Sequence, residues 1–219
     1  MARIRTCFLC VSLFPNMAKY FGTDGIRGTF GDPLMCPDFA FRLGRAIGNF
    51  LKKIRPQKSH CVIIGRDTRS SGIALSGALI AGLNRYDVCV YYADILPTPA
   101  IARSILDKQA DFGIIVTASH NPSCDNGIKL FDYRGYKLDN DEETLIESIL
   151  DKEESVTEGL PTPNSFPIDV CTSYVKYLRS FLEPNALSDW HIVLDLANGA
   201  TVETTPAVFL DSGASLHII

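Results

Sequence analysis

The sequence predicts an α/β protein: a three-layer α/β/α domain with a mixed central sheet, followed by the beginning of a second, similar α/β domain. Short runs of branched apolar residues alternate with longer stretches whose apolar positions recur at helical spacing. This alternation is typical of a sheet covered by helices on both faces. A stretch rich in Glu, Ser, Thr, Gly and Pro over residues 153–167 then separates a first, longer series of elements from a shorter one.

The first domain opens with a helix over residues 38–54, in which apolar residues recur at helical spacing and Asp38 is placed to cap the start. A buried strand, Cys-Val-Ile-Ile, follows at residues 61–64. The polar loop Gly65–Gly72 leads from this strand into a helix of small residues over 73–84. The same logic predicts strands at 88–92, 113–116 and 128–131, and helices at 97–108 and 139–152.

The second domain is predicted from a helix over 168–182, a strand at 192–195, a helix at 201–210 and the start of a strand at 216. An unfinished apolar edge strand promotes aggregation, so we expect the C terminus to be a truncation. We place the first domain at residues 17–155, a linker at 156–167 and the truncated second domain at 168–219.

The composition is that of an ordinary globular protein, with 46% hydrophobic and 21% charged residues in a chain of 219. The formal net charge of -4 gives no general attraction to nucleic acid. No apolar run suggests a membrane span. The 7 cysteines are an odd number without framework spacing, which favours a reducing cytoplasmic setting over a secreted one.

Residues 1–16 are predicted to be an upstream extension, because Met17 leads directly into the motif at residues 21–28. Their charged and then apolar opening imitates a secretory signal, but the apolar run is short and no small-residue cleavage site follows. Cys7 and Cys10 form a C-x-x-C pair, and without a second pair they do not predict a zinc site.

The main candidate for chemistry is Ser119, in the polar loop that follows the strand at 113–116. Open α/β sheets place their ligands at the carboxyl ends of strands. Pro122 restricts the backbone of the residue before it, and Gly127 allows a sharp return into the next strand, so Ser119 is expected at the rim. A serine hydroxyl is a poor nucleophile without a base, cation or metal beside it, and His120 and Lys129 are the candidates for that help.

Two other loops carry residues suited to anions. Arg27 lies in a glycine-punctuated stretch, where a guanidinium can meet phosphate oxygens; the alternative is a solvated arginine on a surface turn. The loop at 65–72 contains Arg66 and Arg69 ahead of a helix, but it lacks a nucleotide P-loop pattern. The alternative there is helix capping by Thr68 or Ser70, with Asp67 paired to an arginine.

Taken together, these stretches resemble the signatures of the α-D-phosphohexomutase superfamily. Thr117–Pro122 with Asp125–Lys129 is similar to its phosphoserine loop, and Gly65–Gly72 resembles a third signature. Phe21–Gly28 is most similar to the opening of the phosphoglucosamine mutase family. The resemblance runs from about Met17 to the last residue, and it implies the fold already predicted.

The resemblance implies an isomerase that interconverts glucosamine 6-phosphate and glucosamine 1-phosphate, a step toward bacterial wall precursors, through a phosphoserine and a bisphosphate intermediate. It assigns catalytic roles to Ser119, His120, Lys129 and Arg27. It assigns phosphate or substrate contacts to Thr23, Arg66 and Asn121. Phosphorylated Ser119 would also be a ligand of Mg²⁺, whose other ligands, like the sugar and distal phosphate loops, belong to further domains whose motifs do not occur in this sequence.

Other readings stay open at this stage. A phosphoglucomutase or phosphomannomutase would share these motifs, because the residues that select the sugar lie in a third domain. A serine hydrolase would use Ser119 with His120 as base, although no G-x-S-x-G motif is present. The chain is also consistent with a non-catalytic phosphosugar-binding remnant. Since several substrate-holding parts are missing, we expect this fragment to be inactive alone.

Overall fold

The computed structural model describes residues 19–56, 59–156 and 159–219. The predicted upstream extension and its cysteine pair lie outside these residues. None of the helices in the described ranges is long and apolar enough to cross a membrane.

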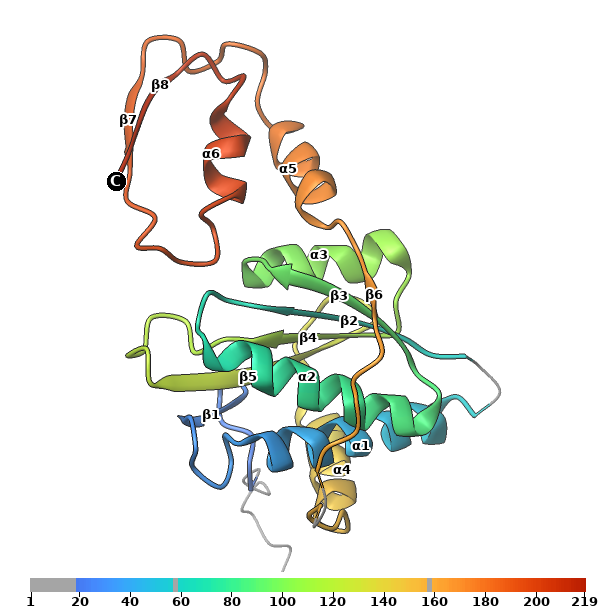
Figure 1. Ribbon diagram of the computed structural model, residues 1–219. Coiled ribbons are helices and arrows are strands. Elements are labelled where there is room, and N and C mark those ends of the chain that lie inside the picture. Colours follow the sequence, from blue (N-terminus) through green and yellow to red (C-terminus); the bar gives the residue numbers. More distant parts are fainter. Residues whose placement is uncertain (1–18, 57–58, 157–158) are drawn as a thin grey trace, which may run out of the picture.

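A six-stranded mixed sheet forms the centre of the first unit, with strand order β1-β5-β4-β2-β3-β6 (Figure 1). The neighbours β4, β2, β3 and β6 run parallel, whereas β5 is antiparallel to both β4 and β1. The predicted fold class, a layered α/β domain with a mixed sheet, is therefore confirmed. The strands are β1 (Ile26–Thr29), β2 (Cys61–Arg66), β3 (Cys89–Ile95), β4 (Phe112–Val116), β5 (Asp125–Asp132) and β6 (Phe166–Pro167).

Helices cover both faces of this sheet (Figure 1). One face packs against α1 (Pro37–Ile54), α2 (Ser71–Leu83) and α4 (Asn140–Leu150), and the other against α3 (Thr98–Lys108) and α5 (Cys171–Arg179). The helices α1 and α2 approach closely at Gly44 and Gly82, where an added Cβ would lie 2.3 Å from the Leu79 carbonyl oxygen and 2.2 Å from that of Phe41. The apolar stripes read from the sequence thus form two cores, one on each side of the sheet.

A smaller unit follows α5. The parallel strands β7 (His191–Leu194) and β8 (Ser215–Ile218) form a two-stranded sheet, with α6 (Thr204–Phe209) between them in the chain. The element types agree with the predicted second α/β series. Figure 1 shows this unit beyond α5, on the α3 side of the main sheet.

Two short edge strands were not predicted from the sequence. Residues 26–29 form the edge strand β1 against β5. Residues 166–167, at the end of the predicted linker, pair with β3 as the strand β6. One local prediction was wrong. Helix α1 has Cys36 rather than Asp38 at its N-cap, because Pro37 already occupies the first turn; the Asp38 carboxylate instead accepts from the Val156 backbone N–H at 2.9 Å.

Candidate active site

Ser119 lies at the exposed tip of the loop that joins β4 to β5. Its backbone is left-handed, with φ of 60°, a conformation that costs a residue with a side chain about 1 kcal/mol or more. Such a conformation persists only where the surroundings enforce it. The hydroxyl is exposed, and its nearest recorded partner is His120, with 3.4 Å between Oγ and Nδ1.

A hydrogen-bonded relay holds the amide side of Ser119. The Ser119 backbone N–H donates to Oγ1 of Thr117 at 3.0 Å, and that hydroxyl donates to Oδ2 of Asp67 at 2.6 Å. Thr117 and Asp67 are both buried. The relay therefore connects the loop after β4 to the loop after β2, the neighbouring parallel strand.

Arg69 holds the carbonyl side of the same loop. Its two terminal amino groups donate to the backbone oxygens of Ser119, Asn121, Pro122 and Asp125, at 2.5 to 3.0 Å. Its Nε donates to Oδ2 of Asp67 at 2.9 Å. Sequence reasoning considered Arg69 as an anion ligand, and the structure shows its guanidinium occupied by the loop backbone instead.

A second charged group lies on the neighbouring strands β1 and β5. The Lys129 ammonium lies 2.7 Å from Oδ1 of Asp24 and 2.9 Å from Oδ2, and the Arg27 guanidinium also contacts this carboxylate. Arg27 further donates to Oδ1 of Asn121 at 3.3 Å, within the Ser119 loop. Two cations and one carboxylate thus connect the β1–β5 edge to the loop.

The turn before β1 brings Asp24 to this position. Gly25 has φ of 86°, and an added Cβ would lie 2.4 Å from the Ile128 carbonyl oxygen, so the turn lies flat against β5 and requires glycine. The hydrogen bond from Lys129 and the nearby positive charges of Lys129 and Arg27 hold the pKa of the Asp24 carboxyl below its usual value, against a smaller opposing effect of burial. Asp24 therefore stays ionised and leaves the two cations partly neutralised.

The structure brings together four of the predicted residues: Ser119, His120, Arg27 and Asn121 are linked by direct contacts along one loop and its neighbour. Lys129 joins them through Asp24. The Thr23 hydroxyl is exposed in the same turn as Asp24. Lys129 is the more enclosed of the two cations, with a side chain 16% exposed.

Arg66 is engaged elsewhere. It is buried, its Nε donates to the Tyr92 hydroxyl at 2.8 Å, and a terminal nitrogen lies 2.7 Å from the carboxylate of Asp94. Its recorded contact with the loop region is to the Asp67 carbonyl oxygen at 3.1 Å. The Arg66 guanidinium is therefore already engaged by Tyr92, Asp94 and the Asp67 carbonyl oxygen.

The capping interpretation of the loop at 65–72 was wrong in part. Ser70 is the N-cap of α2 but makes no side-chain cap bond, and Thr68 donates to the Asn198 carbonyl oxygen at 2.8 Å. The pairing of Asp67 with an arginine was right, and the arginine is Arg69. The Asp125 carboxylate, in the same loop, accepts from Asn121 and Thr29.

Sequence reasoning missed the roles of Asp24 and Thr117, and it paired Asp67 with an arginine without linking that pair to the Ser119 loop. Asp24 and Thr117 belong to stretches that the sequence analysis singled out, but their partners lie far away in the chain. For Asp24, the signal in the sequence was an acid and an arginine in the same short turn. A glycine-rich turn with both an acid and an arginine predicts an ion pair as readily as a ligand site.

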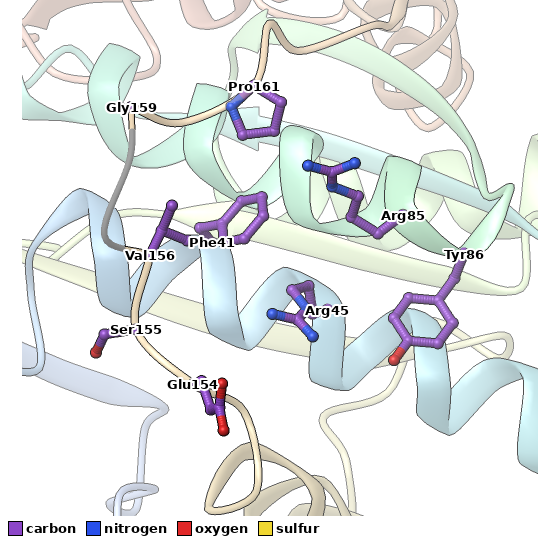
Figure 2. Close-up of a pocket in the computed structure, with 9 residues that line it drawn as sticks. All are labelled: Phe41, Arg45, Arg85, Tyr86, Glu154, Ser155, Val156, Gly159 and Pro161. Carbon is purple, nitrogen blue, oxygen red and sulfur yellow. The ribbon is translucent and has the colours of Figure 1, made fainter.

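Among the described residues, no group of three or more His, Cys, Asp or Glu side chains could hold a metal ion. A separate cavity of about 660 Å³ lies between α1, the short helix η1 (Asn84–Tyr86) and residues from 154–156 and 159–161 (Figure 2). Arg45 and Arg85 line it, but Arg45 is already paired with Glu153 at 2.7 Å. The lining includes none of the predicted site residues.

Residues 18–157 match the family described as phosphoglucomutase/phosphomannomutase, alpha/beta/alpha domain I. The chain belongs to this family. Its Ser119 loop, with the ordered backbone and adjacent cations described above, lies inside the matched region.

Two curated relatives within this family have similar sequences. A phosphoglucosamine mutase from Streptococcus gordonii is 40% identical over 208 residues, which cover 93% of this chain and 45% of the relative. One from Streptococcus pneumoniae is 39% identical over the same span. The chain thus spans less than half the length of these curated relatives.

Solved structures agree with the fold. A phosphoglucomutase/phosphomannomutase family protein from Burkholderia thailandensis has a TM-score of 0.73 at 28% identity, over 91% of this chain and 43% of that one. The exocytosis-sensitive phosphoprotein parafusin, a phosphoglucomutase from Paramecium, has a TM-score of 0.76 at 20% identity, over 90% and 42%. At that identity the second comparison concerns the fold alone.

Proposed function

We propose that this chain supplies the phosphate-carrying serine of a mutase that interconverts glucosamine 6-phosphate and glucosamine 1-phosphate. The observation that carries the proposal is the geometry of Ser119: its backbone is fixed by buried groups, while its hydroxyl is exposed to an incoming substrate. Phosphoryl transfer depends mainly on positioning and on charge around the transferred group, and this loop offers both.

In the proposed reaction, phosphate on Ser119 passes to the free hydroxyl of the hexosamine phosphate. The Oγ–P bond breaks as a bond from phosphorus to the sugar oxygen forms, giving a hexosamine bisphosphate. The other phosphate of this intermediate then returns to Ser119, and the isomeric monophosphate leaves. His120, 3.4 Å from Oγ, is the candidate to position the serine and to exchange a proton with it.

Arg27 and Lys129 are the proposed electrostatic groups. Both now contact Asp24, and both would neutralise oxygens of a phosphate near the loop. Thr23, at the exposed turn, and Asn121, in the loop, are proposed phosphate contacts. Arg66 was expected to bind phosphate directly, and we propose instead that it stabilises the loop after β2 through the Asp67 carbonyl oxygen.

Magnesium enters the proposal only as an ion that the Ser119 phosphate would bind. The described residues supply no cluster that would complete its coordination, so we derive no step through the metal. The remaining ligands would come from domains such as those of the longer relatives. We place the enzyme in the cytoplasm, the compartment suggested by its cysteine usage.

The sugar is the least constrained part of the proposal. Identity to the two phosphoglucosamine mutases favours a glucosamine phosphate. A glucose or mannose phosphate is the second candidate, because the matched family is described by those two activities. A version of the chain extended with the C-terminal part of the Streptococcus gordonii relative would test for mutase turnover. It would not choose among the three sugars, because the residues expected to select the sugar lie in the added part.

The serine itself can be tested in this extended version, which restores the parts expected to hold the substrate. After incubation with glucosamine 1,6-bisphosphate, we expect mass spectrometry of the Ser119 peptide to show one added phosphate, and Ser119→Ala to remain unmodified. Phosphate on another residue, or none after prolonged incubation, would contradict the proposal. Rapid labelling of Ser119 by a fluorophosphonate probe would instead favour the serine hydrolase alternative.

A further inference from the structure

The chain contains two turns with the same Asp-x-Arg hydrogen bonds. In Asp67-Thr68-Arg69, the Arg69 backbone N–H and Nε donate to the Asp67 carboxylate at 3.0 and 2.9 Å. In Asp132-Tyr133-Arg134, the Arg134 N–H and Nε donate to Asp132 at 2.8 and 2.7 Å. This local pattern is thus compatible with two different surroundings.

The two arginines differ in what their remaining nitrogens contact. The Arg134 side chain is 54% exposed, and its guanidinium lies over the rings of Tyr133 and Tyr136 at the far end of β5. The Arg69 side chain is 9% exposed, and its terminal amino groups are fully used by four carbonyl oxygens of the Ser119 loop. The extra contacts of Arg69 are therefore specific to the loop.

The contacts of Asp67 close a ring around Ser119. Its carboxylate accepts from Arg69 and from the Thr117 hydroxyl, which itself accepts from the Ser119 N–H. Arg69 returns to the Ser119 carbonyl oxygen at 3.0 Å. Both peptide groups of the left-handed residue are thereby held by one buried ion pair, and none of these bonds uses the serine hydroxyl.

We propose that Arg69, with Asp67 and Thr117, is a positioning set that holds Ser119 in its left-handed conformation for phosphoryl transfer. The part of this inference that concerns phosphoryl transfer rests on the proposed function. The part that concerns the Ser119 conformation rests only on the hydrogen bonds described above. A planar guanidinium can serve four carbonyls and a carboxylate together, whereas a lysine ammonium has three donors from a single point. The Thr117 hydroxyl must donate and accept at once, which valine cannot do.

The test uses two matched pairs of variants in the version of the chain extended with the C-terminal part of the Streptococcus gordonii relative. Arg69→Lys is compared with Arg134→Lys, which changes the same kind of ion pair away from the loop. Thr117→Val is compared with Thr117→Ser, which keeps the hydroxyl. The first readout is hydrogen exchange at the Ser119 amide, and the second is the rate of phosphate transfer to Ser119 from glucosamine 1,6-bisphosphate.

We expect Arg69→Lys and Thr117→Val to speed exchange at the Ser119 amide about fivefold or more, the effect of losing one net hydrogen bond. We also expect them to slow phosphate transfer roughly tenfold or more, with little change in its dependence on donor concentration. Arg134→Lys and Thr117→Ser should resemble the unaltered chain in both. Equal behaviour within each pair would overturn the inference.

The two readouts keep this inference separate from the proposed function. If neither the variants nor the unaltered chain accept phosphate on Ser119, the proposed function is wrong. The hydrogen-exchange data then still show whether the positioning set holds the Ser119 backbone. If phosphate transfer occurs and both pairs behave alike, the positioning set fails and the function stands. Should Arg69→Lys not fold, shown by lost far-UV circular dichroism, the Thr117 pair decides the outcome.

Discussion

At the scale of single residues, the Asp24 carboxylate determines how much positive charge the site offers. It contacts both Lys129 and Arg27, so in the unphosphorylated chain the two cations are partly neutralised. A phosphate on or near Ser119 would compete with Asp24 for the same donors. Lys129 is the better enclosed cation, and its charge is therefore the less screened by water.

The first prediction concerns Lys129. In the version of the chain extended to the length of its relatives, Lys129→Ala should lower turnover on the order of a hundredfold or more, as for loss of one preorganised charge. Lys129→Arg is the charge-preserving control and should retain more activity. The measurement is initial rate with glucosamine 6-phosphate, and an unchanged rate in Lys129→Ala would remove this residue from the site.

The second prediction concerns the titration of Asp24. Its pKa is lowered chiefly by the hydrogen bond from Lys129, so the ion pair is present above the usual aspartate pKa and is lost as the pH falls through the lowered value. Carbon-detected NMR of the Asp24 carboxyl should show a midpoint below the usual one. In Lys129→Ala the midpoint should rise; the same midpoint in both proteins would show that Lys129 is not the cause.

Much of the candidate site could be predicted from sequence at this scale, because Ser119, Lys129 and Arg27 lie in stretches with unusual local chemistry. What could not be predicted were the partners. Asp24 is 105 residues from Lys129, and Asp67 is 50 residues from Thr117. The order of the strands in the sheet determines which acidic side chain pairs with a given basic one. The spacing of apolar residues in the sequence does not predict that order.

At the scale of elements, the turn before β1 places both Asp24 and Arg27. Gly25 has a positive φ of 86° and also lies against the Ile128 carbonyl oxygen, whereas Gly31 has a positive φ of 104° with open space around it. A side chain at Gly31 would meet backbone strain alone, whereas one at Gly25 would also clash with β5. Of these two glycines, Gly25 combines both effects.

The third prediction compares Gly25→Ala with Gly31→Ala. Both substitutions should destabilise the chain by about 1–3 kcal/mol through backbone strain. Gly25→Ala should cost more, because its Cβ would push β1 away from β5. Urea unfolding followed by circular dichroism measures the difference. Equal losses in the two variants would show that β1 does not lie tightly against β5.

Strong periodic patterns made most elements predictable. The helices α1 and α2 and the strands β2 to β5 lie where apolar spacing placed them, within a few residues. The failures were the edge strands β1 and β6, whose pairing supplies what their short sequences do not. Edge strands of four and two residues carry too little periodicity to separate them from turns.

At the scale of the whole molecule, the division of the chain stays a prediction: a first domain at 17–155, a linker at 156–167 and a second domain from 168. The structure shows the linker's last residues paired to the main sheet, and Thr68 donates to Asn198 in the smaller unit. The second contact joins the loop that holds Arg69 to the turn after β7.

The fourth prediction is that the 219-residue chain alone does not measurably interconvert glucosamine phosphates. Ser119 and His120 are exposed, and enclosure and alignment of the substrate supply most of the rate in this chemistry. A coupled assay with Ser119→Ala as the blank is the measurement. Turnover above that blank would show that the described residues suffice.

The central claim is that Ser119 passes its phosphate to a sugar phosphate and takes one back. Its most direct test is a single-turnover chase: the extended protein, labelled with radioactive phosphate on Ser119, is mixed with unlabelled glucosamine 6-phosphate and quenched rapidly. We predict that the label leaves the protein and appears first in glucosamine bisphosphate. Label that stays on Ser119, or that is released only as inorganic phosphate, would contradict the account.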